Sequence, residues 1–286
     1  MYDEFDIVCV MGPTASGKTR YAVDLARRMG AEIISADSRQ VYRGMDIGTG
    51  KDLAEYGEIP YHLIDIVDAG TKYNIFQYQK DFETAYQDIL QRGKRAVMCG
   101  GSGLYIEAAC CGYSLPDVPP NPALRAELEQ YDTETLIARL ASLQHLHNST
   151  DYDTRQRLIR ALAIAIYQQE HPVSHSRLLP RKTKFLALDV SRDERNARID
   201  ARLKARLDEG LVEEVKKLLQ RGIAAEDLIY YGLEYKFVTL YLTGQLSREE
   251  MTVRLATAIH QFAKRQMTWL RGMERRGIEI EWVKPL

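Results

Sequence analysis

A glycine-rich octapeptide near the N-terminus constrains this chain more than any other feature. It has the pattern G-x-x-x-x-G-K-[ST] and consists of Gly12, Pro13, Thr14, Ala15, Ser16, Gly17, Lys18 and Thr19. An apolar run over residues 5–11 precedes it, and a helix-like run over residues 20–29 follows it. This succession of strand, loop and helix is the context in which the motif forms a phosphate-binding loop, or P-loop.

The residue types of the P-loop suit a diphosphate or a nucleotide. Successive backbone N–H groups and the positive end of the helix dipole surround anionic oxygens. Lys18 adds a full positive charge, and the Thr19 hydroxyl is the expected protein ligand of a Mg²⁺ cofactor. The motif therefore predicts a polyphosphate site, but it does not specify the reaction.

Short apolar segments alternate with helical patterns along most of the chain. The segments are residues 31–36, 61–67, 96–99, 185–190 and 278–283. This alternation predicts an α/β fold, a P-loop NTPase-like parallel sheet flanked by helices. A proline-rich stretch at residues 115–122 and helical periodicity over residues 123–169 interrupt it. We therefore predict a catalytic core of residues 1–114 and 183–286 with an all-helical insertion domain over residues 115–182.

Composition narrows the class of protein. The 286 residues are 45% hydrophobic and 28% charged, which is ordinary for a globular protein. With a net charge of −1, any affinity for nucleic acid must come from local patches. The four cysteines lack C-x-x-C spacing, which indicates a reducing compartment. The acidic start and the absence of a long apolar run favour a cytoplasmic protein without a membrane span.

Aspartates follow three of the predicted strands, where parallel sheets bind their ligands. Asp37 follows the second strand, Asp65 and Asp68 fall at the third, and Asp189 follows a late strand and resembles a Walker B acid. A strand directly after the P-loop helix often lies beside the P-loop strand, which favours Asp37 as a general base or Mg²⁺ ligand. The alternative is that Asp37 caps the turn before Ser38.

A basic segment lies in the predicted insertion. Between residues 154 and 184 there are seven lysines and arginines and one acidic residue. Arg157 and Arg160 are three residues apart and share a helix face, while Leu158 and Ile159 lie on the opposite face. Such a face contacts nucleic-acid phosphates, or it is simply a solvated helix surface.

Longer motifs carry a resemblance to a known family. SADSRQVYRGMDIGTGK, over residues 35–51, resembles the ISADSxQVYRGMDIGTAKP signature of the tRNA dimethylallyltransferases, also called isopentenyl-tRNA transferases. GPTASGKT, CGGSGLYI, RQRLIRAL, RIDARLKARLDEGLVEEVKKLL and FAKRQMTWLRG resemble further signatures of that family in the same order. They span residues 12–272. The chain is identified as a member of the bacterial type, since no zinc finger follows the last motif.

The resemblance implies a reaction. The family transfers a dimethylallyl group from dimethylallyl diphosphate to the exocyclic amine of the adenosine 3′ to the anticodon, in tRNAs that read codons beginning with U. The P-loop would hold the leaving diphosphate through Lys18 and through Thr19 with Mg²⁺. Asp37 would be the catalytic base, and Arg202 would be a second cation on the diphosphate.

The resemblance also implies which residues contact the tRNA, and it shows three positions at which this sequence departs from the family pattern. Residues matching family positions that contact the tRNA anticodon stem-loop are Asp37, Ser38, Arg39, Gln40, Ser102, Arg125, Gln156, Arg157, Leu158, Ile159 and Arg160. A monomer without membrane contact is expected. Ser102 stands where the family usually has threonine, Asp52 replaces a proline, and His260 replaces an arginine.

Two other functions fit the P-loop. One is an adenylate isopentenyltransferase that modifies free AMP or ADP, although a free nucleotide needs no basic insertion. The other is a P-loop nucleotide-binding switch, which requires a Walker B acid. Asp189 is the candidate for that acid.

Overall fold

The computed structural model describes residues 2–113, 118–143, 154–171 and 180–286. These fall into two compact units, which are described separately below. The first contains residues 2–113 and 180–286, and the second contains residues 118–143 and 154–171. Two features of the sequence analysis lie outside the described residues. They are the domain boundary predicted after residue 114, and Arg177 of the basic segment.

A six-stranded parallel sheet forms the centre of the first unit, in the order β4-β2-β6-β1-β7-β8. The strands are β1 (Ile7–Met11), β2 (Ala31–Ala36), β4 (Tyr61–His62), β6 (Arg95–Gly100), β7 (Thr183–Leu188) and β8 (Ile280–Val283). Successive side chains of a strand point to opposite faces. Ile7 and Cys9 therefore pack into one hydrophobic core, and Val8 and Val10 into another.

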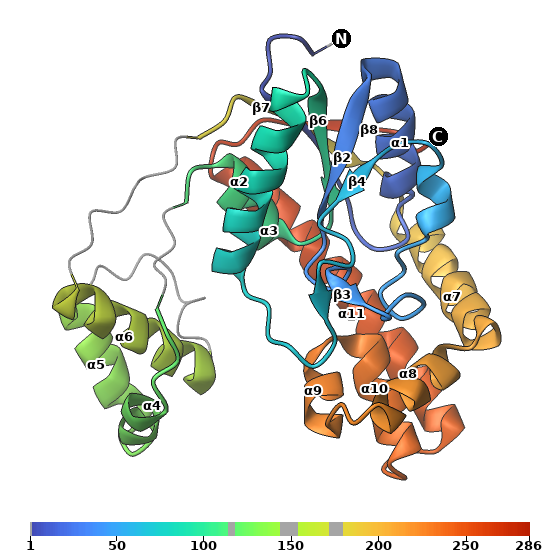
Figure 1. Cartoon of the computed structure of the whole chain (residues 1–286). Helices are drawn as coiled ribbons and strands as arrows, with labels where there is room; N and C mark the ends of the chain where they lie inside the picture. The colour runs from blue at the N-terminus through green and yellow to red at the C-terminus, as the bar shows by residue number, and fades with distance from the viewer. Residues whose placement is uncertain (1, 114–117, 144–153, 172–179) are drawn as a thin grey trace. The chain divides into compact units, whose positions relative to one another are not determined.

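Helices cover both faces of this sheet, as predicted for an α/β fold. The core around Val8 includes α1 (Lys18–Met29) and the 3-10 helix η1 (Leu53–Tyr56). Figure 1 shows α1 on the face opposite α2 and α3. The core around Ile7 contains side chains of α2 (Ile75–Gln91), α3 (Gly103–Cys110), α7 (Arg192–Glu209), α8 (Leu211–Gln220), α9 (Ala225–Tyr230), α10 (Leu233–Leu242) and α11 (Arg248–Arg275). No helix in the described ranges is long and apolar enough to cross a bilayer.

Two expectations about the strands were wrong. Residues 61–67 form no continuous strand, because Leu63 and Asp65 have φ angles of 62° and 56°, which are incompatible with extended backbone. Instead β4 ends early, and β5 (Val67–Asp68) pairs with β3 (Tyr42–Arg43). Nor does β2 lie beside β1, since β6 is inserted between them. Sheet order depends on a strand about sixty residues downstream, which local sequence does not reveal.

The second unit is helical throughout its described elements, as predicted. It contains α4 (Pro122–Leu128), α5 (Thr133–Leu143) and α6 (Arg155–Glu170). Leu158 and Leu162 of α6 are fully buried against Leu136 and Leu140 of α5. The Thr154 hydroxyl accepts a hydrogen bond from the Arg157 N–H and caps the start of α6.

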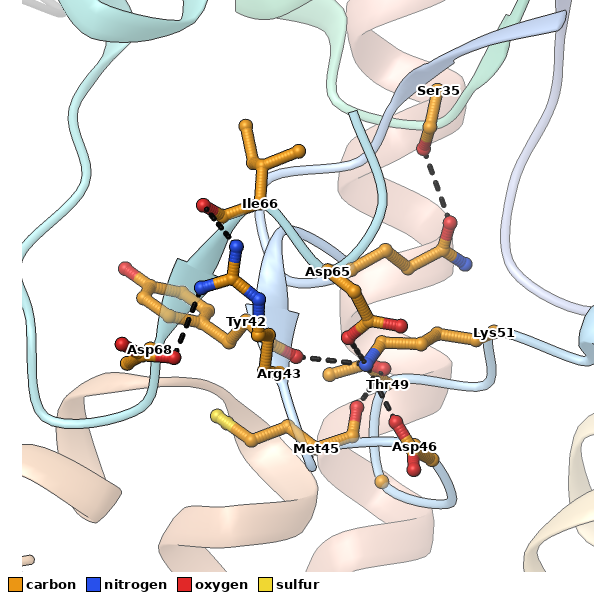
Figure 2. Close-up of polar contacts among 12 residues, drawn as sticks. Ser35, Tyr42, Arg43, Met45, Asp46, Thr49, Lys51, Asp65, Ile66 and Asp68 are labelled. Carbon is orange, nitrogen blue, oxygen red and sulfur yellow. Dashed lines mark hydrogen bonds and ion pairs between the residues drawn. The ribbon is translucent and has the colours of Figure 1, made fainter. Parts of the chain in front are cut away.

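A buried lysine fixes the loop that follows β2. The Lys51 side chain is 1% exposed, and its Nζ donates to the Tyr42 carbonyl at 2.7 Å and to Asp46 Oδ1 at 2.6 Å. It also pairs with the Asp65 carboxylate (Figure 2). The charge of Lys51 is thus compensated on three sides. Asp65, a candidate site residue by its position in the sequence, is a structural partner of this lysine.

Replacing Lys51 by methionine tests this anchor. The variant keeps the side-chain length but leaves two carboxylates and a carbonyl without their donor. We expect Lys51→Met to lower the free energy of unfolding by about 2 kcal/mol, less than for a wholly buried pair because both carboxylates are partly solvated. Urea unfolding measures it. Lys72→Met, at an exposed lysine, is the control, and an equal effect of both variants would contradict the anchor.

Candidate active site

Three loops meet at the carboxyl edge of the sheet because the strands before them end at one level. Met11 of β1 and Ala36 of β2 are both register partners of Gly100 in β6. The P-loop, residues 37–40 and residues 101–102 therefore begin side by side. The Ser38 N–H donates to Ser102 Oγ at 3.2 Å and joins two of these loops.

The P-loop has the backbone form that its sequence predicts. Gly17 has a φ of 84° and Ala15 a φ of 59°, and Ser16 between them is not among the positive-φ residues, so the sign of φ alternates along the loop. Such alternation turns successive N–H groups toward one point. The Lys18 ammonium donates to the Pro13 carbonyl at 3.5 Å. The Ser16 hydroxyl is buried and has no hydrogen-bond partner among the described residues.

A cavity of about 280 Å³ opens at this edge. The predicted site residues that line it are Thr14, Lys18, Thr19, Asp37, Ser38, Arg39, Gln40, Ser102 and Arg202. The other P-loop residues, Gly12, Pro13, Ala15, Ser16 and Gly17, shape the loop and are not among the lining residues. We call this cavity the P-loop pocket. It brings together the proposed phosphate-binding and base residues from separate parts of the sequence.

Three cations converge on the P-loop pocket. Arg202 and Arg206 lie one turn apart on α7 and line the pocket with Lys18. Burial lowers the pKa of Lys18, and the positive charges of the two arginines act in the same direction, against Cys99 and Asp37. Burial also lowers the pKa of Arg206. A bound anion would relieve both penalties, so the pocket is electrostatically suited to a diphosphate.

Carboxylates balance part of this charge. Arg206 Nη1 lies 3.4 Å from Glu234 Oε1, whose pKa is raised by burial against the effect of Arg206. Arg202 pairs with Asp52. Asp37 Oδ1 accepts the Arg39 N–H at 2.9 Å, so the predicted turn cap is present. The same side chain lines the pocket, and capping therefore does not exclude a catalytic role.

The oxygen donors of the pocket fit Mg²⁺. Thr19 and Asp37 both line it, and hard oxygen ligands are those that Mg²⁺ prefers. Within the described ranges no group of three or more His, Cys, Asp and Glu side chains could hold a metal.

Sequence reasoning missed several pocket residues. Gln266 of α11 accepts the Thr14 N–H at 2.9 Å and donates to the Gly101 carbonyl at 3.0 Å, which ties the P-loop to the loop after β6. Its position inside FAKRQMTWLRG was the available signal. Arg206 could have been found from its i+4 spacing to Arg202. Glu234 and Tyr56 had no signal.

The predicted tRNA-binding residues of the insertion lie in the second unit. Arg125, Gln156, Arg157 and Arg160 are exposed there. Leu158 is fully buried in the helical core, so its side chain is not available to RNA, whereas Ile159 is 5% exposed and lines a groove of this unit. The exposed residues other than Arg157 also line a groove of about 600 Å³ within this unit.

Three further residues singled out in the sequence are engaged elsewhere. Asp189 accepts a hydrogen bond from Lys284 Nζ at 2.6 Å and does not line the P-loop pocket. Asp68 pairs with Arg43 at 2.9 Å (Figure 2). His260, which replaces an arginine of the family pattern, contacts Asp200 of α7 at 2.8 Å. None of these three side chains lines the P-loop pocket.

Comparison with known families places these features in context. The model of the IPP transferase family matches residues 40–273, and that of the isopentenyl transferases matches residues 5–59. A solved tRNA isopentenylpyrophosphate transferase from Bacillus halodurans is 33% identical with a TM-score of 0.71, over 98% of this chain and 89% of that one. A eukaryotic dimethylallyltransferase acting on tRNA is 25% identical with a TM-score of 0.78, over 98% of this chain and 73% of that one.

Curated relatives agree with the solved structures. tRNA dimethylallyltransferase 1 of Porphyromonas gingivalis is 59% identical over 98% of this chain and 94% of its own length. tRNA dimethylallyltransferase 1 of Parabacteroides distasonis is 54% identical over 98% of this chain and 92% of its own length. With the family model covering most of the chain and the P-loop pocket formed as the motifs predict, this chain belongs to the tRNA dimethylallyltransferase family.

Proposed function

We propose that the protein transfers a dimethylallyl group from dimethylallyl diphosphate to the exocyclic amine of the adenosine 3′ to the anticodon, in tRNAs that read codons beginning with U. One observation carries the proposal: the P-loop with Lys18 and Thr19 opens into the same pocket as Asp37 and Arg202. Cations for a leaving diphosphate and a carboxylate for a proton are thus within one small cavity. Membership of the family supports the choice of substrates.

The cations act on the leaving group. As the adenosine amine attacks the allylic carbon, the bond from that carbon to the diphosphate oxygen breaks, and negative charge grows on the diphosphate. Lys18, Arg202 and the P-loop N–H groups are in place to stabilise that charge without reorganisation. Thr19 would hold a Mg²⁺ ion, which supplies further charge neutralisation when bound.

Asp37 acts on the nucleophile. An aryl amine is a weak nucleophile and gains a positive charge as it attacks, so its proton must leave. We assign that proton to the Asp37 carboxylate, which the Arg39 N–H holds in place at 2.9 Å. The adenine must first leave the anticodon stack to enter the pocket. Ser38, Arg39, Gln40 and Ser102 line the same pocket and are proposed to contact the RNA there.

The second unit supports tRNA over free AMP as the acceptor. Its exposed Arg125, Gln156, Arg157 and Arg160 offer phosphate and polar contacts that a mononucleotide does not need. All four cysteines are free thiols, which supports a reducing compartment such as the cytoplasm. We further propose that the protein acts as a monomer, because one chain supplies all residues of the P-loop pocket.

The structure weighs against a nucleotide switch. Such a protein uses a Walker B acid to hold its metal, in addition to Asp37, which is assigned here as the base. Asp189, the candidate from sequence, is bonded to Lys284 instead. We therefore assign the P-loop to the diphosphate of the prenyl donor and not to ATP hydrolysis.

An assay with labelled dimethylallyl diphosphate tests this assignment. The wild type should transfer label to tRNA without ATP and should leave AMP unmodified. Lys18→Ala should abolish transfer, since the departing diphosphate loses its nearest full charge. Thr19→Ala should make the rate much less responsive to Mg²⁺. A requirement for ATP, or enzyme-like ATP turnover by the protein alone, would refute the proposal.

The base assignment is tested at Asp37 itself. Asp37→Asn keeps an oxygen that can accept the Arg39 N–H, but it cannot take a proton. We expect both Asp37→Asn and Asp37→Ala to reduce kcat by about 10²-fold or more, with tRNA binding nearly intact. Asp68→Asn, which removes a charge from a different strand end, should retain full activity. Near-normal turnover of Asp37→Asn would show that another group accepts the proton.

The RNA surface of the second unit is tested by the salt dependence of binding. Changing Arg157 and Arg160 together to alanine should weaken tRNA binding about tenfold and flatten the plot of log K against log salt by about two contacts. Affinity for the diphosphate should not change. The matched control changes Arg27 and Arg28, exposed at the end of α1 remote from the P-loop. Equal salt slopes for the two double variants would make the α6 arginines ordinary surface residues.

A further inference from the structure

An acidic residue that departs from the family pattern contacts a cation of the P-loop pocket. Asp52 stands where the family usually has proline, and its carboxylate pairs with the Arg202 guanidinium. Asp52 has a φ of 46°, which the ring of proline cannot adopt. The replacement thus introduces both a charge and a backbone conformation that proline would exclude.

This contact is held on a fixed support. Glu214 accepts hydrogen bonds from the N–H groups of Asp46, Ile47 and Gly48 at 2.8, 2.7 and 3.0 Å. Lys51, directly before Asp52, is buried among its own partners. Both ends of the segment before Asp52 are therefore bonded to the body of the first unit.

The carbonyl of Gly50 adds a second contact to the same guanidinium. It accepts from Arg202 at 3.4 Å and from Gln40 Nε2 at 3.1 Å. Gln40, Gly50 and Arg202 all line the P-loop pocket. Asp52 is thus positioned at the edge of the pocket, on the arginine proposed to bind diphosphate.

Exposure makes the pair exchangeable. The Asp52 side chain is 44% exposed and that of Arg202 is 29% exposed, so water can solvate the carboxylate once it leaves. Charge-assisted bonds to one guanidinium compete when both acceptors are anions, because the anions repel each other. A diphosphate oxygen that approaches Arg202 must therefore displace or crowd the carboxylate.

We propose that Asp52 is a built-in competitor for the diphosphate: it neutralises Arg202 in the free enzyme and weakens the binding of both dimethylallyl diphosphate and the released pyrophosphate. The inference rests on the proposed function, in which Arg202 binds the leaving group. Weaker retention of pyrophosphate favours product release. Asp52 also supplies a counter-charge that offsets the repulsion among Lys18, Arg202 and Arg206.

Calorimetric titration with Mg²⁺-pyrophosphate tests the proposal. Asparagine tolerates a positive φ and removes the charge at nearly constant shape, so Asp52→Asn should keep the fold. We expect it to bind pyrophosphate about three- to tenfold more tightly and to be inhibited by pyrophosphate at correspondingly lower concentration. The KM for dimethylallyl diphosphate should fall by a similar factor. Glu58→Gln, which removes an exposed acid paired with Arg27, should match the wild type.

A double-mutant cycle separates this inference from the proposed function. Arg202→Gln should weaken pyrophosphate binding, and adding Asp52→Asn to it should restore nothing. If Arg202→Gln weakens binding while Asp52→Asn leaves it unchanged or weaker, Asp52 does not compete but holds Arg202 or a metal ion in place, and the inference is wrong. If Arg202→Gln binds normally, or the wild type binds no pyrophosphate, the diphosphate site itself is wrong.

Discussion

The site depends on the close approach of two strand ends. Ala36 and Gly100 are register partners at the carboxyl edge of the sheet, and a Cβ atom on Gly100 would lie 2.2 Å from the Ala36 carbonyl oxygen. A side chain there would push apart β2 and β6, on which Asp37 and Ser102 depend. Because Met11 also pairs with Gly100, the P-loop shares this level. The geometry of catalysis is thus set by backbone packing beneath the pocket.

Charge is the second constraint on the pocket. Gathering Lys18, Arg202 and Arg206 in a small cavity costs desolvation and mutual repulsion, which lowers the pKa of Lys18 and of Arg206. Glu234 and Asp52 offset part of that cost through their ion pairs with Arg206 and Arg202. The two acids differ in exposure, since the Glu234 side chain is 19% exposed and that of Asp52 is 44% exposed. Water solvates the more exposed carboxylate better once it leaves its arginine, so Asp52 is the partner more readily exchanged for substrate.

The parts of the site that sequence could predict are those encoded in contiguous motifs. The P-loop was predicted because one short segment determines its backbone. Asp37 lines the pocket as predicted. The strand order expected from the sequence was nevertheless wrong, because β6 separates β2 from β1. The prediction of a strand over residues 61–67 was wrong because apolar patterning does not reveal the positive φ of Leu63. Gln266 and Glu234 come from helices far along the chain, where only tertiary packing brings them to the pocket.

The effect of a departure from the family pattern depends on where the substituted side chain lies in the structure. In sequence, Asp52 in place of proline and His260 in place of arginine are equivalent observations. In the structure His260 contacts Asp200 between two helices, outside the residues that line the P-loop pocket, so its effect on the diphosphate is indirect. Asp52 contacts Arg202, which lines the pocket, so a change in its charge reaches the ligand through one guanidinium. Coulomb energy falls with distance and with solvent screening. The substitution at Asp52 therefore has the greater influence on diphosphate binding.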